Sequence, residues 1–153
     1  MSSVSWPHYP QMPPLTQEET ESFLKEGHIA KLGSFNEDGT IHLAPAYNMY
    51  ECGSILLGTQ MVSRKVRNIR RNNNVSVLID NYEPPFKGVL IYGKAELDTD
   101  DVVAKRTSLF ENYMPSDEAA GLAQGLADQF EPVIIRVRPE RIVSYDYNKA
   151  SIV

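Results

Sequence analysis

The sequence contains a single cysteine, Cys52, and three histidines among its 153 residues. One thiol cannot form a disulfide within the chain, and it cannot build a metal site made only of cysteines. The histidines, His8, His28 and His42, are not spaced like metal ligands, so we expect no metal site. Cys52 lies in a predicted turn without a neighbouring histidine, which excludes the usual surroundings of a catalytic thiolate.

Long apolar segments are absent as well. The longest uncharged apolar runs, such as 89–92 and 133–135, are too short to cross a bilayer. Residues 1–15 contain four prolines and no lysine or arginine, which is unlike a signal peptide. We therefore expect a cytoplasmic protein that does not associate with membranes. The chain also has no G-x-S-x-G, P-loop or G-x-G-x-x-G motif, so it is not expected to be a serine hydrolase, a nucleoside triphosphatase or a Rossmann protein.

Acidic residues outnumber basic ones by 20 to 15, and the net charge of −5 argues against binding to nucleic acid. The basic residues are nevertheless unevenly distributed. Five of them fall within positions 64–71, namely Arg64, Lys65, Arg67, Arg70 and Arg71. A local cationic cluster on an anionic protein suggests a small anionic ligand.

The pattern of apolar residues and turns predicts a mainly β fold of the α+β class. Strands are expected at 28–35, 40–50, 54–58, 75–80, 88–97, 132–137 and 141–147. Helices are expected from a capping box at Thr16 and Glu19 to about residue 26, and over 63–71, 98–113 and 116–129. The first three strands leave no room for crossover helices, which favours a small antiparallel barrel over a doubly wound sheet. We expect residues 1–15 to form an extended arm and residues 16–153 a single domain.

The most informative stretch is 58–70, where a strand ends, a short loop follows and a helix begins. Ser63 is the expected N-cap, and two cations follow it directly. A phosphate at such a helix start could accept bonds from backbone N–H groups, from the Thr59 and Ser63 hydroxyls, and from Arg64 and Lys65. The same residues also fit a surface helix with solvated cations, and the pattern alone leaves both interpretations open.

The order of several segments gives a further indication. Residues 29–34, 36–39, 63–65, 67–72, 75–79 and 88–97 follow one another, and 141–147 fit a final strand. Together they resemble the pyridoxamine 5′-phosphate oxidase-like proteins of the FMN-binding split-barrel fold. This resemblance implies a six-stranded antiparallel split β-barrel with flanking helices. It also implies a homodimer with FMN in the groove between the subunits.

The resemblance assigns the phosphate end of the cofactor to five residues. Ser63, Arg64 and Lys65 match the phosphate site of the family. Gly58 and Thr59 match the end of the preceding strand, which touches the phosphate and the ribityl chain. The residues expected from the helix start and those implied by the resemblance therefore coincide.

The ring end of the cofactor is assigned in the same way. Ala46, Tyr47 and Asn48 match the strand whose backbone runs along the isoalloxazine ring. Lys87, or Gly88 beside it, matches the position from which the second subunit reaches the flavin. No catalytic side chain is implied, because the flavin itself carries the redox chemistry.

Departures from the family pattern bear on the substrate. Leu43 stands where true pyridoxamine phosphate oxidases carry an arginine, and their R-x-x-x-S and R-x-H motifs are missing near 112–117 and 138–141. We therefore expect a flavin-dependent oxidoreductase acting on a small molecule other than vitamin B6. Two alternatives remain open: a reductase that uses the deazaflavin F420, whose acidic tail would need further cations such as Arg67, Arg70 and Arg71, and a non-catalytic flavin-binding protein. Haem binding ranks last, because no histidine is placed to be an axial ligand.

Overall fold

The computed structural model describes residues 3–7 and 12–150. Their strands form one seven-stranded antiparallel sheet in the order β2-β1-β5-β6-β7-β4-β3. The strands are β1 (Ala30–Phe35), β2 (Ile41–Ala46), β3 (Asn48–Glu51), β4 (Ser54–Gln60), β5 (Asn74–Asp80), β6 (Lys87–Asp98) and β7 (Pro132–Asp146). The helices are α1 (Gln17–Leu24), α2 (Arg64–Arg71), α3 (Val102–Phe110) and α4 (Ser116–Gln129), with a 3₁₀ turn η1 (Tyr147–Lys149) near the C-terminus.

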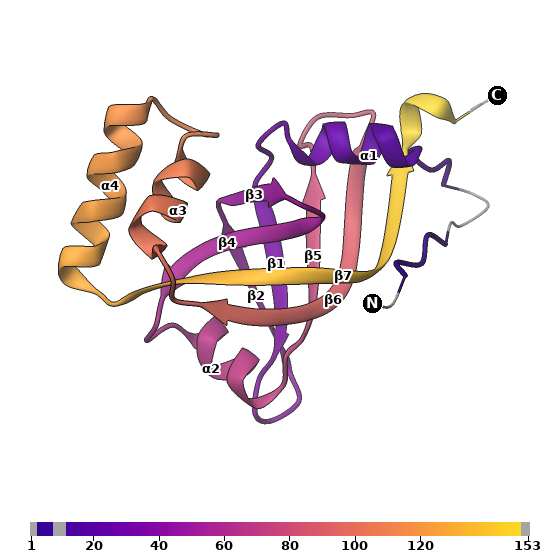
Figure 1. Cartoon of the computed structure of the whole chain (residues 1–153). Helices are drawn as coiled ribbons and strands as arrows, with labels where there is room; N and C mark the ends of the chain where they lie inside the picture. Colours follow the sequence, from indigo (N-terminus) through magenta and orange to yellow (C-terminus); the bar gives the residue numbers. More distant parts are fainter. Residues whose placement is uncertain (1–2, 8–11, 151–153) are drawn as a thin grey trace.

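The sheet curls into a half-barrel, which confirms the split barrel, but it has seven strands where the family resemblance implied six (Figure 1). The predicted strand 40–50 is divided at Tyr47, because β2 pairs with β1 while β3 pairs with β4 on the other side of the barrel. The two predicted final strands are one continuous strand, β7. Pro139 does not end it, because β7 has a bulge here: Tyr92 pairs with Arg141 and Gly93 with Pro139, which leaves Glu140 as an extra residue. A Cβ at Gly93 would lie 2.2 Å from the Arg138 carbonyl oxygen, so only glycine fits there.

Two helix starts agree with their sequence signals. The capping box of α1 is present, with the Thr16 hydroxyl 3.1 Å from the Glu19 amide and the Glu19 carboxylate 2.9 Å from the Thr16 amide. Ser63 caps α2 by accepting a hydrogen bond from the Val66 amide. Helix α3 starts later than predicted, because β6 continues to Asp98, whose carboxylate is paired with Lys105 at 2.8 Å.

Apolar side chains form two cores on opposite faces of the sheet. The larger core fills the inside of the curl and includes Leu57 of β4. The smaller one lies between the outer face of β4 and β7 and the pair α3–α4, and it includes Leu56 and Ile134. Figure 1 shows α3 and α4 side by side at one end of the sheet, with α2 beneath and α1 across the other end. Gly58 pairs with Ile134, so its face of β4 is the one turned toward α3.

The described part of the N-terminal arm lies along β7 of its own chain. The Ser5 amide donates to the Glu140 carbonyl at 2.9 Å, and the Ile142 amide donates to the Ser5 carbonyl at 2.8 Å. Residues 1–2 and 8–11 of the predicted arm, with His8 among them, and residues 151–153 lie outside the described residues. Within 3–7 and 12–150, none of the helices has the length and apolar character needed to cross a membrane.

Candidate functional site

Helix α2 presents its N-terminus and its cations on the surface next to the end of β4. Ser63 is half-buried, Arg64 is exposed and Lys65 is half-buried. Among the described residues, the five cations of positions 64–71 form no salt bridge. The helix start therefore offers unpaired N–H groups and positive charge. Asp38 is close enough that Arg64, after the hydrogen bonds from Thr40, contributes to lowering the pKa of its carboxyl group.

A second cation, Arg106 of α3, lies close to Lys65. Arg106 is only 4% exposed, and its Cζ lies 5.5 Å from the centre of the Phe110 ring. Burial lowers the pKa of Lys65, and the nearby charge of Arg106 lowers that pKa further. Burial also lowers the pKa of Arg106. Both side chains thus carry their charge in surroundings that disfavour it.

The guanidinium of Arg106 has no partner within the described part of the chain. Its Nε and Nη1 atoms are buried and make no hydrogen bond. An unpaired buried charge is costly, and proteins usually neutralise one with a counter-ion. Lys65 cannot serve, because it carries the same charge. The pair fits an anionic group bound between α2 and α3, such as the phosphate of a flavin cofactor.

Gly58 makes room for Arg106. A Cβ at position 58 would lie 2.9 Å from Arg106 Nε and 3.0 Å from its Cγ. Thr59 faces the other way, because it pairs with Val133 and alternates with Gly58 along β4. The structure therefore brings Gly58 toward the two cations, whereas the buried Thr59 points toward the larger core.

Tyr47 and Asn48 contact the end of α3 and the turn that follows it. The Tyr47 ring is 41% exposed and lies 4.5 Å from the Tyr113 ring and 5.6 Å from the Phe110 ring. Asn48 is buried, and both its backbone and side-chain nitrogens donate to the Tyr113 hydroxyl at 3.0 Å. Ala46 is half-buried at the end of β2. This part of the predicted site is an aromatic cluster on the same side of the barrel as Arg106.

Lys87 lies away from the other candidate residues of the same chain. It begins β6 and pairs with Asp146, whereas the opposite end of β6 pairs with Ile134 next to Gly58. Its Nζ atom lies 5.3 Å from the centre of the Phe23 ring on α1. Within one chain, Lys87 therefore does not reach the site at α2. The contact of Lys87 with the flavin from a second subunit stays a prediction.

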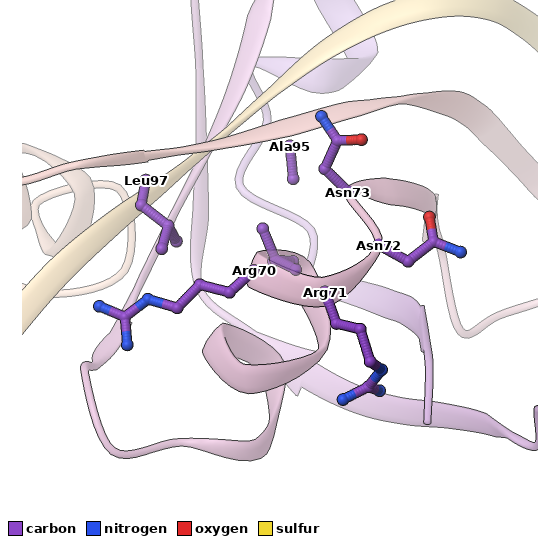
Figure 2. A pocket seen from close by; sticks show the side chains of 7 residues that line it. Arg70, Arg71, Asn72, Asn73, Ala95 and Leu97 are labelled. Carbon is purple, nitrogen blue, oxygen red and sulfur yellow. The ribbon is translucent and has the colours of Figure 1, made fainter. Parts of the chain in front are cut away.

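An apolar groove of about 750 Å³ crosses the outer face of β1, β2, β5 and β6. Its walls include Phe35, Ile41, Leu43, Leu90 and Tyr92. Leu43 is 72% exposed, which is high for a leucine on a regular strand. A second hollow, of about 590 Å³, lies at the other end of α2 (Figure 2). There the side chains of Arg70 and Arg71 diverge on either side of the helix end.

Arg106 is the site residue that the sequence interpretation missed. Its neighbours at helical spacing, Val102, Leu109 and Phe110, are all buried. An arginine in the middle of the apolar face of a helix is a recognisable signal, because arginine is almost never fully buried unless paired. That signal indicates a buried charge, but it does not reveal that Lys65 and Gly58 lie beside it.

Comparison with known proteins agrees with this architecture. The family model for pyridoxamine 5′-phosphate oxidase matches residues 16–145. Among solved structures, the conserved hypothetical protein Rv2991 from Mycobacterium tuberculosis aligns with a TM-score of 0.82 at 23% identity, covering 96% of this chain and 94% of that one.

Two further solved structures share the fold. An F420 reductase aligns with a TM-score of 0.66 at 22% identity, covering 83% of this chain and 98% of that one. An FAD-binding protein from Mesorhizobium loti aligns with a TM-score of 0.60 at 22% identity, covering 87% and 93% of the two chains. A search of curated proteins found no match.

Proposed function

Because the chain belongs to the pyridoxamine 5′-phosphate oxidase family, we propose that it binds FMN and uses it as an oxidoreductase acting on a small molecule. The main support for this proposal is the pair of cations Lys65 and Arg106 near the start of α2. Neither of them forms a salt bridge with an acidic residue in the described structure. The solved flavin- and F420-related structures with the same fold support a cofactor of the flavin type. The exposed Cys52 fits the reducing cytoplasm in which we expect the protein to act.

In this proposal the residues around α2 hold the phosphate end of the cofactor. The Ser63 hydroxyl and the first N–H groups of α2 donate hydrogen bonds, while Arg64 and Lys65 add charge-assisted ones. Gly58 lets the chain come close at the end of β4, whereas the buried Thr59 side chain points toward the larger core and is left out of the proposed site. FMN supplies the hydride or electron transfer when it is bound, and the protein supplies binding and orientation.

The flavin ring is assigned to the aromatic end of the site. Tyr47 offers an exposed ring that is held by Phe110 and Tyr113, and Ala46 and Asn48 flank it on the strand. Since the Asn48 nitrogens already bind Tyr113, we assign Asn48 the task of fixing Tyr47 and the nearby backbone. An apolar, largely fixed wall of this kind suits a planar ring.

The second subunit is the occupant that we propose for the apolar groove. Ile41 and Leu43 are exposed on one side of it, and Leu90 and Tyr92 line the other. A contiguous apolar surface of this kind usually marks an interface, and small homo-oligomers are most often two-fold symmetric. The packed barrel has no room for a tricyclic ring inside, so the cofactor would lie in an outer groove. Lys87 of the partner subunit would then complete the site.

One observation favours F420 as an alternative cofactor. Arg70 and Arg71 line the hollow at the far end of α2 and have no carboxylate partner in the described structure (Figure 2). The acidic tail of F420 could extend along α2 from Lys65 past Arg67 to these arginines. On the same fold the protein would then be an F420-dependent reductase.

The absorption spectrum of the purified protein tests these assignments. Bound FMN gives two bands in the near-ultraviolet and blue, whereas bound F420 gives one. Bleaching of the bands by NADH or NADPH, followed by recovery in air, would support an oxidoreductase. A bound flavin that neither donor reduces, and that no small-molecule acceptor reoxidises after chemical reduction, would instead indicate a non-catalytic flavin-binding protein.

A further inference from the structure

We propose that Arg106 of α3 binds the phosphate monoester of the cofactor together with Lys65, so that the α3–α4 pair forms part of the cofactor site of its own chain. This inference rests on the proposed flavin function and assigns a residue outside the Ser63–Lys65 motif to the site. If Arg106 binds the phosphate, then the phosphate as well as the ring determines which flavin the protein accepts.

Arg106 is buried, and part of its guanidinium has no hydrogen-bond partner among the described residues. The side chain is 4% exposed, yet Nε and Nη1 lack any hydrogen-bond partner in the described chain. Its aliphatic part and Nε lie against Gly58, at the end of β4 that leads to α2. The residue at position 58 has no side chain that could cover the guanidinium. The unpaired Arg106 nitrogens therefore lie where the end of β4, α2 and α3 come together.

Lys65 and Arg106 bring two positive charges to the same part of the structure. Lys65 lies near enough for the Arg106 charge to lower its pKa, and neither residue has an acidic partner among the described residues. Asp101 and Glu111, the acidic residues nearest to Arg106 in the sequence, form no salt bridge with it in the described structure, and Asp98 is already engaged by Lys105 at 2.8 Å and Arg136 at 3.4 Å. Two desolvated positive charges repel each other, and a bound anion would remove that repulsion.

The charge of the ligand can be matched to the site. A phosphate monoester carries between −1.5 and −2 charges at neutral pH and offers three acceptor oxygens. Lys65 and Arg106 together supply a matching +2, and the guanidinium can form a two-point contact with two oxygens. A phosphodiester, with a single charge, would leave one of the two cations uncompensated. The site therefore fits FMN better than riboflavin or the diester group of F420.

Arg106→Met tests the proposal with a side chain of similar length, and Arg138→Met is the control, because Arg138 is exposed and paired with the exposed Glu96. We expect Arg106→Met to weaken FMN binding by about 10- to 100-fold, as for the loss of a charge-assisted hydrogen bond. Riboflavin, which lacks the phosphate, should bind parent and variant within about twofold. Without ligand, Arg106→Met should melt at the same or a higher temperature than the parent, since it removes an unpaired buried charge.

Inorganic phosphate provides a measurement that does not depend on the flavin. It should raise the melting temperature of the parent and of Arg138→Met, and have much less effect on Arg106→Met. If the parent binds FMN and Arg106→Met binds it equally tightly, the proposal for Arg106 is wrong while the flavin function stands. If the parent binds no flavin but phosphate still stabilises it through Arg106, the flavin function fails and the anion site remains. Equal stabilisation of parent and Arg106→Met by phosphate would show that Arg106 is not part of the anion site, and no stabilisation of the parent would overturn the anion site itself.

Discussion

The hydroxyl of Tyr113 binds both nitrogens of Asn48, the backbone N and the side-chain Nδ2, each at 3.0 Å. It thereby joins the turn between α3 and α4 to the first residue of β3. The same hydroxyl lies 3.3 Å from the His28 carbonyl oxygen and 3.2 Å from that of Asn48, so it can also donate. Three segments far apart in the sequence meet at this one oxygen.

Tyr113→Phe should therefore lower the free energy of unfolding by about 1–3 kcal/mol, because it leaves the Asn48 backbone N–H without a partner, while the Asn48 side chain keeps its bond to the His28 carbonyl at 2.6 Å. Urea denaturation followed by circular dichroism measures this loss. Tyr47→Phe is the matched control, since the Tyr47 ring is partly exposed, and it should change stability by less than about 0.5 kcal/mol. Equal losses in the two variants would show that the Tyr113 hydroxyl is not a structural link.

Gly58→Ala should disturb Arg106. The new Cβ would lie 2.9 Å from Arg106 Nε, closer than real contacts allow, so the buried arginine must move. We expect a loss of about 1–3 kcal/mol in stability from overpacking, together with weaker FMN binding. Gly121→Ala on α4, where nothing lies within 4 Å of the new Cβ, should instead stabilise the protein by about 0.5–1 kcal/mol. If the two alanine variants have the same stability and the same FMN affinity, Arg106 does not lie over Gly58 in solution.

Lys65 should make FMN binding depend on pH. Burial and Arg106 lower its pKa in the free protein, so the residue begins to lose its proton below the ordinary lysine range. A bound phosphate favours the protonated form and raises that pKa again. FMN affinity should therefore be full at neutral pH and fall as pH rises through the lowered pKa. In Lys65→Arg the affinity should stay constant over the same interval, because arginine keeps its charge. A parallel decline in the parent and in Lys65→Arg would assign the titration to another group.

The proposed dimer depends on the apolar groove. Leu43→Glu should place a charge in the lining of the groove and convert the dimer into monomers in sedimentation velocity at micromolar concentration. Val62→Glu is a closely matched control, because Val62 is also 72% exposed but lies outside the groove. The control should remain dimeric. A parent protein that is monomeric while it retains bound FMN would refute the shared groove.

Local signals explain the parts of the fold that could be predicted from the sequence. The caps at Thr16 and Ser63 depend on residues three positions apart, so both helix starts were predicted correctly. The continuity of β7 through Pro139 could not be predicted, because it depends on a bulge at Glu140 that appears only when β7 pairs with Tyr92 and Gly93 of β6. In the same way, Arg106 reaches the candidate site only because α3 packs on β4, a contact that no local pattern encodes.

The central claim is that the start of α2 binds the phosphate of a flavin, and a fluorescence titration of Lys65→Ala with FMN tests it most directly. We expect this substitution to weaken binding by about 1.5–3 kcal/mol, the loss typical of a charged hydrogen bond. Lys25→Ala, which removes an exposed lysine at the end of α1, should bind FMN like the parent. Equal FMN affinity of Lys65→Ala and the parent would contradict the account.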